Sequence, residues 1–211
     1  MAYTIASCRR CALIDRVIVS TDSAEYAEIA MSYGAEAPFI RPEELAKCDS
    51  PDIEFIVHAL DWLADEEREP STVVHMRPTT PFRDPDVVSR GITAFVENED
   101  ASALRSVHEM SESAYKTLEM SPEGWLAPLG MVERALDTAN LARQGFPTTY
   151  VANGYVDVLS VRFIRSTGLM HGDRVMAFLT PPAVEVDTEM DFQLLEYCVA
   201  NDPSLVSPVK E

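Results

Sequence analysis

The chain has 211 residues, of which 46% are apolar, enough to build one sizeable α/β domain with a small appendage. Thirty-five acidic residues against seventeen basic ones give a net charge of −18, and so negative a surface repels phosphate backbones, which excludes nucleic acid as an expected partner. Arg9 and Arg10 interrupt the start before any signal-peptide-like apolar stretch develops, and no apolar run is long enough for a bilayer, so we expect a soluble cytoplasmic protein without a membrane partner.

The first half of the chain predicts alternating helices and strands. The short β-branched run at 16–20 is typical of a strand buried in a parallel sheet. Ser50 and Pro51 are expected to begin a helix, as its N-cap and first helical residue. In chain order, the predicted elements of this half are helix 3–13, strand 16–20, helix 22–34, helix 51–63, strand 72–76, helix 84–96 and strand 102–107.

The regular alternation stops between residues 108 and 150, where prolines and glycines are scattered and apolar periodicity is weak. A stretch of that length is too long for a structureless loop in a compact domain. We expect an excursion with its own hairpin or helix, which projects from the sheet and meets a partner subunit. Strand 155–160, helix 161–166, strand 175–179 and helix 189–200 follow, so the expected class is α/β with a mainly parallel sheet.

The loop at 77–83 directly follows the predicted strand 72–76 and contains two arginines, Arg77 and Arg83, with two threonines, Thr79 and Thr80. Open α/β sheets bind ligands at the carboxyl ends of their strands, and arginines with hydroxyls suit phosphate or carboxylate groups. The alternative is a proline-rigidified loop whose arginines pair with surface acids.

Glu185 and Asp187 lie two residues apart in a segment expected to be extended, which places both carboxylates on one face. Two like charges at that separation are unfavourable unless a cation joins them, and oxygen ligands of this kind suit Mg²⁺. The alternative is a solvated strand end in which Asp187 or Thr188 caps the following helix.

Polar residues also gather in the segments 143–147 and 153–157, of which Arg143 and Asn153 are the candidates for orienting a polyhydroxy acid. The default interpretation of Asn153-Gly154 is a turn. Cys8 and Cys11 have the CxxC spacing, but two cysteines on an amphipathic helix are more often small core residues than a metal or redox pair.

Several segments, taken in order, resemble the acylneuraminate cytidylyltransferase family, whose members make CMP-sialic acid and related CMP-ulosonic acids. Residues 16–22 resemble the motif D-R-V-I-V-S-T-D, and residues 35–46 resemble G-A-E-x-P-F-x-R-P-x-x-L-A. Residues 75–83 resemble H-L-R-P-T-T-P-L-R, and residues 186–192 resemble V/I-D-x-x-x-D-F. The resemblance covers nearly the whole chain, and the ordered set is far more specific than any one motif.

This resemblance implies a Rossmann-like (GT-A-like) nucleotidyltransferase fold over residues 1–211, usually dimeric, in which the excursion at 108–150 reaches the neighbouring subunit's site. The implied reaction joins CTP and a 2-keto sugar acid to give a CMP-sugar and pyrophosphate, with Mg²⁺ as cofactor. The sugar's anomeric hydroxyl attacks the α-phosphorus, so the protein orients the reactants and neutralises charge. Legionaminic, pseudaminic or 3-deoxy-manno-octulosonic acid stay open as alternative substrates.

The resemblance also implies roles at matching positions. Asp187 is the leading metal ligand, and Glu185 stands where the family often has a second aspartate. Arg41 faces the nucleotide. The remaining candidates lie beside the sugar acid: Arg77 (also a candidate catalytic residue, at a position where glutamine is frequent), Thr79, Asn153, Asp157 and Arg143. Asp157 replaces the tyrosine of an N-G-A-I-Y segment, which points to a sugar other than plain N-acetylneuraminate.

Residues 1–5 match the helix that follows the family's first βα loop. The first strand and the phosphate-binding loop A-R-G-G-S-K-x-x-x-x-K-N therefore have no counterpart here, and we expect an N-terminally truncated domain. A noncatalytic relative that serves as a dimerising subunit is the alternative that this departure favours.

Overall fold

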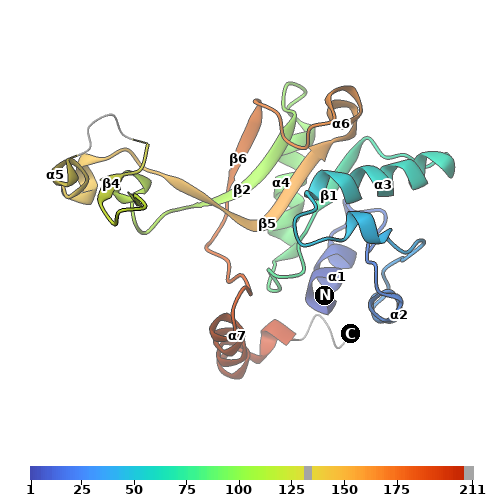
Figure 1. The fold of residues 1–211 in the computed structure, drawn as a ribbon. Helices are drawn as coiled ribbons and strands as arrows, with labels where there is room; N and C mark the ends of the chain where they lie inside the picture. Colours follow the sequence, from blue (N-terminus) through green and yellow to red (C-terminus); the bar gives the residue numbers. More distant parts are fainter. Residues whose placement is uncertain (131–134, 207–211) are drawn as a thin grey trace. The chain divides into compact units, whose positions relative to one another are not determined.

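The computed structural model describes residues 1–130 and 135–206. The chain forms two compact units, one made of residues 1–106 together with the chain from residue 153 onward, and one made of residues 107–152. Figure 1 labels the elements of both units. Residues 131–134 of the predicted excursion lie outside the described residues.

A four-stranded sheet forms the centre of the first unit, with the strand order β1-β5-β2-β6. These strands are β1 (Thr72–His75), β2 (Ala103–Glu109), β5 (Tyr150–Ser160) and β6 (Val175–Leu179). The α/β class expected from the sequence is confirmed. The sheet is mixed rather than mainly parallel, because β1 and β5 pair antiparallel, with Thr72 opposite Ser160 and His75 opposite Asp157. The chain enters β5 from the 107–152 segment rather than through the helical crossover that connects parallel neighbours.

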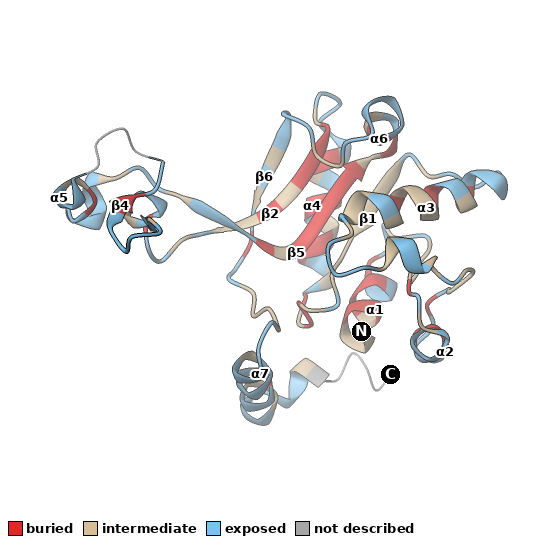
Figure 2. Ribbon diagram, in the orientation of Figure 1, coloured by how far each residue is buried: buried red, intermediate tan, exposed pale blue. Residues whose placement is uncertain are grey.

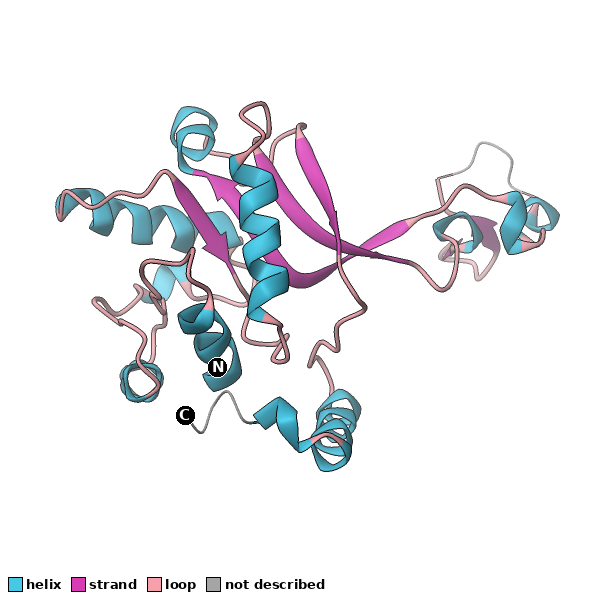
Figure 3. Ribbon diagram, turned by 180° about the vertical axis from the view of Figure 1, so that it is seen from behind, coloured by secondary structure: helices cyan, strands magenta, loops and turns pink. Residues whose placement is uncertain are grey.

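Helices cover both faces of this sheet. The helices of the unit are α1 (Ala2–Arg10), α2 (Ala24–Ser32), α3 (Asp52–Asp65), α4 (Pro85–Val96), α6 (Val161–Thr167) and α7 (Glu189–Asn201), with short 3-10 helices at Glu43–Leu45 and Pro203–Val206. Figure 3 shows α4 lying across one face of the sheet. On that face, Val88 and Ile92 of α4 pack against Val156 and Val158 of β5. On the opposite face, Ile56 and Leu60 of α3 pack with Leu159 and with Ile164 of α6.

The side-chain alternation of β5 decides which of its residues reach each face. Val156 and Val158 join the α4 core, while Leu159 joins the α3 core. Asp157 alternates with the two valines and therefore lies on the α3 face, within the part of the strand that Figure 2 colours as buried. A carboxylate at this place in a core strand is unusual, because Asp is almost never fully buried without a partner.

Side-chain N-caps are observed at most of the helix starts, and the one considered at Thr188 is among them. Ser23, Asp84, Ser160 and Thr188 each accept a hydrogen bond from a backbone N–H in the first turn of the helix that follows. An exception is Ser50: Pro51 takes the N-cap position of α3, because the Ser50 hydroxyl accepts a hydrogen bond from the backbone of Lys47 instead. Cys8 and Cys11 are buried core residues, as expected for two cysteines on an amphipathic helix. Burial raises the pKa of the Cys8 thiol to about 11.

The predicted strand at 16–20 is not a strand in the structure. The segment makes one isolated parallel bridge, between Ile18 and Glu36, through hydrogen bonds of 2.8 Å from Val19 and 2.7 Å to Val17. Within the described residues it pairs on that side alone, so its β-branched side chains stay half-buried. The sequence predicted the extended conformation correctly and its place inside a sheet wrongly.

The second unit contains both a hairpin and short helices, as expected for so long a segment. Strands β3 (Leu118–Met120) and β4 (Leu126–Pro128) pair antiparallel, and α5 (Leu136–Ala139) follows. Two 3-10 turns, Ala114–Lys116 and Arg143–Gly145, bring the rings of Tyr115 and Phe146 into a stack with centroids 5.9 Å apart. In the described part of the chain, no helix is both long and apolar enough to cross a membrane.

Candidate functional site

Charged side chains meet where β1 ends and α3 begins. Arg77, two residues after β1, donates a hydrogen bond of 2.6 Å to the carboxylate of Asp52 in the first turn of α3. Its other terminal nitrogen lies 3.8 Å from the carboxylate of Asp157. The guanidinium stays partly exposed. Arg77 therefore pairs with an acid, as the alternative interpretation of this loop held, and its binding of a ligand stays a prediction.

Asp157 lies at the centre of that cluster and is 2% exposed. Arg105 of β2 approaches it to 3.7 Å, and His171 in the segment after α6 approaches it to 3.8 Å. Burial lowers the pKa of His171 and also that of His75, which stands opposite Asp157 on β1. Sequence reasoning missed Arg105 and His171. The available signal for Arg105 was an arginine inside a predicted strand, whereas the sequence around His171 gave no signal.

Arg41 lies at the same end of α3. It hydrogen-bonds to the hydroxyl of Ser20 at 3.0 Å and to the carbonyl of Ser20, and its guanidinium stacks over the Phe55 ring at 4.5 Å. The Phe55 ring in turn contacts the His75 ring, with centroids 5.6 Å apart. Burial lowers the pKa of Arg41. Arg41 and Arg77 are therefore both arranged around the first turns of α3.

Arg83, the second arginine of the loop, is buried and builds the site instead of facing it. It donates to the backbone carbonyls of Tyr155 (2.6 Å), Gly154 (2.8 Å) and Arg77 (2.6 Å), and to the hydroxyl of Thr4 (3.0 Å). Burial lowers its pKa to about 10. This residue fastens the loop to β5 and to α1, so a single arginine of the pair is available to a ligand.

The acidic segment lies directly against this loop. The backbone N–H of Val186 donates to the carbonyl of Thr79 at 2.8 Å, and the Thr79 hydroxyl contacts the Glu185 carboxylate at 3.3 Å. Contrary to expectation, residues 181–188 form no strand, so the argument from side-chain alternation does not apply to Glu185 and Asp187. Val186 uses its backbone to reach the loop rather than a neighbouring strand.

Asp187 precedes a helix whose cap is complete without its carboxylate. Thr188 caps α7 in a reciprocal capping box with Asp191, and the Asp191 carboxylate also accepts the backbone N–H of Asp187. The Asp187 side chain is exposed and unpaired among the described residues. No group of three or more potential metal ligands occurs in the described residues. The magnesium assignment therefore stays a prediction that rests on Glu185 and Asp187.

Asn153 is buried and its amide is already engaged. Its Nδ2 donates to the Thr180 hydroxyl at 2.7 Å, and its Oδ1 accepts the backbone N–H of Tyr155 at 3.3 Å. Gly154 has a φ of +63°, and a Cβ there would lie 2.9 Å from the Thr80 hydroxyl and 3.4 Å from Glu185. Asn153-Gly154 thus forms a bend within β5 rather than the turn between elements that was the default interpretation.

Arg143 belongs to the second unit. It forms an ion pair of 2.7 Å with Glu109 and donates to the carbonyl of Met110 at 3.1 Å. These residues, with Ser113 and Phe146, line a cavity of about 340 Å³ inside that unit. Its predicted contact with a sugar acid stays a prediction.

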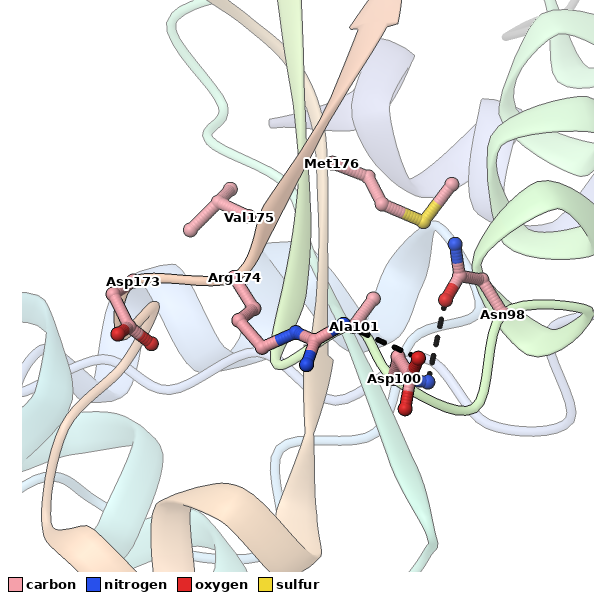
Figure 4. Close-up of a pocket in the computed structure, with 7 residues that line it drawn as sticks. All are labelled: Asn98, Asp100, Ala101, Asp173, Arg174, Val175 and Met176. Carbon is pink, nitrogen blue, oxygen red and sulfur yellow. Dashed lines mark hydrogen bonds and ion pairs between the residues drawn. The ribbon is translucent and has the colours of Figure 1, made fainter.

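A further cavity of about 240 Å³ lies in the first unit, beside the start of β6 (Figure 4). Arg174 pairs there with Asp100 at 3.2 Å, and Asn98 accepts the backbone N–H of Asp100. None of the predicted site residues lines this cavity. It is a solvated surface hollow separate from the cluster around Asp157.

Comparison with known proteins gives a family model described as "Cytidylyltransferase", which matches residues 1–121. This range includes Arg41 and the whole 77–83 loop. Over 200 residues the chain is 29% identical to the N-acylneuraminate cytidylyltransferase of Escherichia coli O18:K1:H7, covering 92% of this chain and 44% of that protein. It is 24% identical over 204 residues to post-translational flagellin modification protein B of Campylobacter coli, covering 94% of this chain and 83% of that protein.

Solved structures show the same fold at low sequence identity. The structure of CMP:2-keto-3-deoxy-manno-octonic acid synthetase complexed with CTP superposes with a TM-score of 0.65 at 10% identity, covering 95% of this chain and 87% of that one. The 4-diphosphocytidyl-2C-methyl-D-erythritol synthase of Anaerococcus prevotii gives a TM-score of 0.59 at 8% identity, covering 94% and 85%. The chain spans less than half the length of the E. coli relative.

Proposed function

Because the chain belongs to the cytidylyltransferase family, we propose that it transfers CMP from CTP to the anomeric hydroxyl of a sialic-acid-like 2-keto sugar acid. In this reaction the anomeric oxygen forms a bond to the α-phosphorus, the bond from that phosphorus to the bridging oxygen of the leaving group breaks, and pyrophosphate departs. The hydroxyl proton is released. The single observation that carries the proposal is the placement of Arg41 and Arg77 around the first turns of α3 in a chain of net charge −18.

An enzyme of this kind must bring two anions together, so positive groups are required where they meet, in addition to the proposed Mg²⁺. Arg41, stacked on Phe55, is proposed to face the nucleotide. Arg77 and Asp157 are proposed to face the sugar acid, with Thr79 beside them. Such groups act by orientation and by stabilising charge that develops on the transferred phosphate. Asn153 is proposed to position the bend at Gly154, because both of its amide functions already hold protein partners.

Mg²⁺ is the proposed cofactor, and Asp187 and Glu185 would hold it. Their chemistry fits, because Mg²⁺ is usually bound by one or two carboxylates together with substrate phosphates and water. The exposed Asp187 carboxylate has no competing partner among the described residues. The ion supplies neutralisation of the charge on the triphosphate. The contacts of Thr79 with Glu185 and Val186 hold the two carboxylates next to the 77–83 loop, here called the arginine loop.

The second unit is proposed to mediate a homodimer. Large apolar side chains are exposed on its hairpin, including Met120 at 72% and Trp125 at 77%. Large apolar side chains that are exposed together on one element often mark a site where another protein binds. Arg143 would then reach a sugar carboxylate across the dimer. A cytoplasmic location is part of the same proposal, since CTP is the donor.

The test measures pyrophosphate release by the purified chain with Mg²⁺, supplying CTP, UTP or ATP together with one sugar acid at a time. N-acetylneuraminate, legionaminate, pseudaminate and 3-deoxy-manno-octulosonate form the panel of acceptors. Release is expected with CTP and at least one acceptor, and not when the acceptor is omitted. A chain that self-associates but releases no pyrophosphate with any pair contradicts the proposal and favours a noncatalytic dimerising subunit.

A further inference from the structure

Polar side chains from four separate segments meet on the α3 face of the sheet. His75 on β1 and Asp157 on β5 stand directly opposite each other, and Arg105 lies on β2, the strand on the other side of β5. His171 arrives from the segment after α6. The three strands thus present an imidazole, a carboxylate and a guanidinium side by side, with a second imidazole next to the carboxylate.

Several polar atoms of this cluster are buried without hydrogen bonds. Of the nine such side-chain atoms in the described residues, five belong here: Nδ1 of His75, Nε of Arg105, both carboxylate oxygens of Asp157 and Nε2 of His171. The nitrogens of Arg77, Arg105 and His171 nearest to Asp157 lie 3.7 to 3.8 Å from it, beyond hydrogen-bond distance. Buried polar groups are almost always paired in native proteins. Two unpaired carboxylate oxygens and three unpaired nitrogens next to them therefore indicate a place for a polar group of a ligand.

The charge balance of the cluster decides what kind of group fits. Arg77 is neutralised by Asp52, and Asp157 faces Arg105. Burial lowers the pKa of His75 and of His171, which favours uncharged imidazoles near neutral pH. No excess positive charge is left to attract a carboxylate or phosphate. The unpaired atoms include two strong acceptors on Asp157 and a donor on Arg105. A neutral group that both donates and accepts a hydrogen bond is complementary to them.

We propose that Arg105 and Asp157 form a specificity-determining pair that binds a neutral hydroxyl or acylamino substituent of the acceptor sugar acid. The O–H or N–H of the substituent donates to Asp157, and its oxygen accepts from Arg105. Arg105 and Arg77 are 36% and 30% exposed, so the cluster is reached from solvent past their guanidinium groups. The inference rests on the proposed transfer to a sugar acid and adds Arg105 and His171 to its site.

The experiment titrates the full chain with N-acetylneuraminate, which carries an acylamino group and hydroxyls, and with 3-deoxy-manno-octulosonate, which carries hydroxyls alone. Calorimetry compares the wild type with Arg105→Gln, Arg105→Lys and the near-isosteric Asp157→Asn. Arg174→Gln removes a surface arginine from the separate cavity beside β6 and is the matched control. We expect Arg105→Gln and Asp157→Asn to weaken sugar-acid binding about tenfold, the effect of losing one hydrogen bond to a charged group. CTP binding and the Arg174→Gln variant stay unchanged.

The pattern of loss identifies the substituent. Weakening confined to N-acetylneuraminate assigns the acylamino group, and equal weakening for both ligands assigns a hydroxyl. Arg105→Lys keeps the charge but lacks the buried Nε donor. If Arg105→Gln does not fold, the affinities of Arg105→Lys and Asp157→Asn for the sugar acids test the inference instead. Wild-type affinity for both sugar acids in folded variants overturns the inference, as does a wild type that binds neither. Arg105-dependent binding without CTP-dependent pyrophosphate release rejects the proposed transfer and leaves this inference standing.

Discussion

The backbone N–H of Val186 donates a hydrogen bond of 2.8 Å to the carbonyl oxygen of Thr79. The Thr79 hydroxyl also meets the Glu185 carboxylate at 3.3 Å, so two contacts join segments that are 106 residues apart in the sequence. The loop that contains Arg77 and the segment that contains Asp187 are therefore neighbours. This relationship places the proposed metal ligands beside the loop that contains Arg77.

Replacing Asp187 by Asn should remove the metal dependence of the reaction. The substitution keeps the shape of the side chain and removes the charge that we assign to Mg²⁺, so kcat is expected to fall roughly a hundredfold or more. Steady-state pyrophosphate release across a Mg²⁺ titration measures this. Glu196→Gln removes an exposed charge on the far part of α7 and should leave the titration unchanged. Equal activity of the two variants would show that Asp187 is not a metal ligand.

Gly154→Ala should disturb the junction between β5 and the arginine loop. The new Cβ would meet the Thr80 hydroxyl at 2.9 Å, at a φ of +63° that alanine already tolerates poorly. Gly124→Ala is a matched control, because Gly124 also has positive φ, at +87°, but nothing lies within 4 Å of its Cβ position. Both variants should lose about 1 kcal/mol from backbone strain, and Gly154→Ala should lose more and reduce kcat/KM. Indistinguishable urea midpoints would refute the steric argument.

Arg83→Met should destabilise the first unit strongly. The substitution leaves the carbonyls of Tyr155, Gly154 and Arg77 without their shared donor, and each unpaired buried acceptor costs about 1–3 kcal/mol. A loss of about 3 kcal/mol or more in the free energy of unfolding is expected from urea denaturation. Arg10→Met changes an exposed arginine at the end of α1 and should shift stability by less than about 0.5 kcal/mol. A small effect of Arg83→Met would mean that water or rearrangement satisfies these carbonyls.

The elements were predictable from the sequence where local signals and burial agree. Asp84 followed by Pro85, and Thr188 three residues before Asp191, mark helix starts that the structure reproduces. The segment at 16–20 shows the limit, because β-branched composition predicts an extended backbone but not the neighbours it pairs with. The direction of β5 is another non-local property, since it depends on the path of the chain through the second unit.

Residues of the proposed site could likewise be predicted where local sequence identifies them, but not where their role depends on non-local neighbours. Arg77 was a candidate from the chemistry of its loop and Asp157 from the family resemblance, and they lie together because a loop and a strand meet there. Arg83 has the same residue type as Arg77 but a buried environment, which sequence alone does not distinguish. Arg105 and His171 escaped prediction because their importance comes from proximity to Asp157 across the sheet.

Stability should depend on pH through His75. Burial is the main cause that lowers its folded-state pKa below the ordinary value of about 6.5, with Arg77 adding to it and with Asp52 and Asp157 opposing it. Below pH 6.5 the unfolded chain therefore binds a proton that the folded chain does not, and the free energy of unfolding falls as pH falls toward the folded pKa. Urea denaturation from pH 7 to pH 5 should show a shallower decline in His75→Gln than in wild type. Parallel curves would show that this histidine does not contribute.

The central claim is that the chain joins CMP to a sugar acid, and phosphorus NMR of the reaction tests it most directly. The chain is incubated with CTP, Mg²⁺ and a sugar acid from the panel, and the phosphorus signals are followed with time. We expect the signal of a CMP phosphodiester and that of pyrophosphate to grow in equal amounts, and only when the sugar acid is present. Formation of CDP and inorganic phosphate, or unchanged CTP with every acceptor, would contradict it.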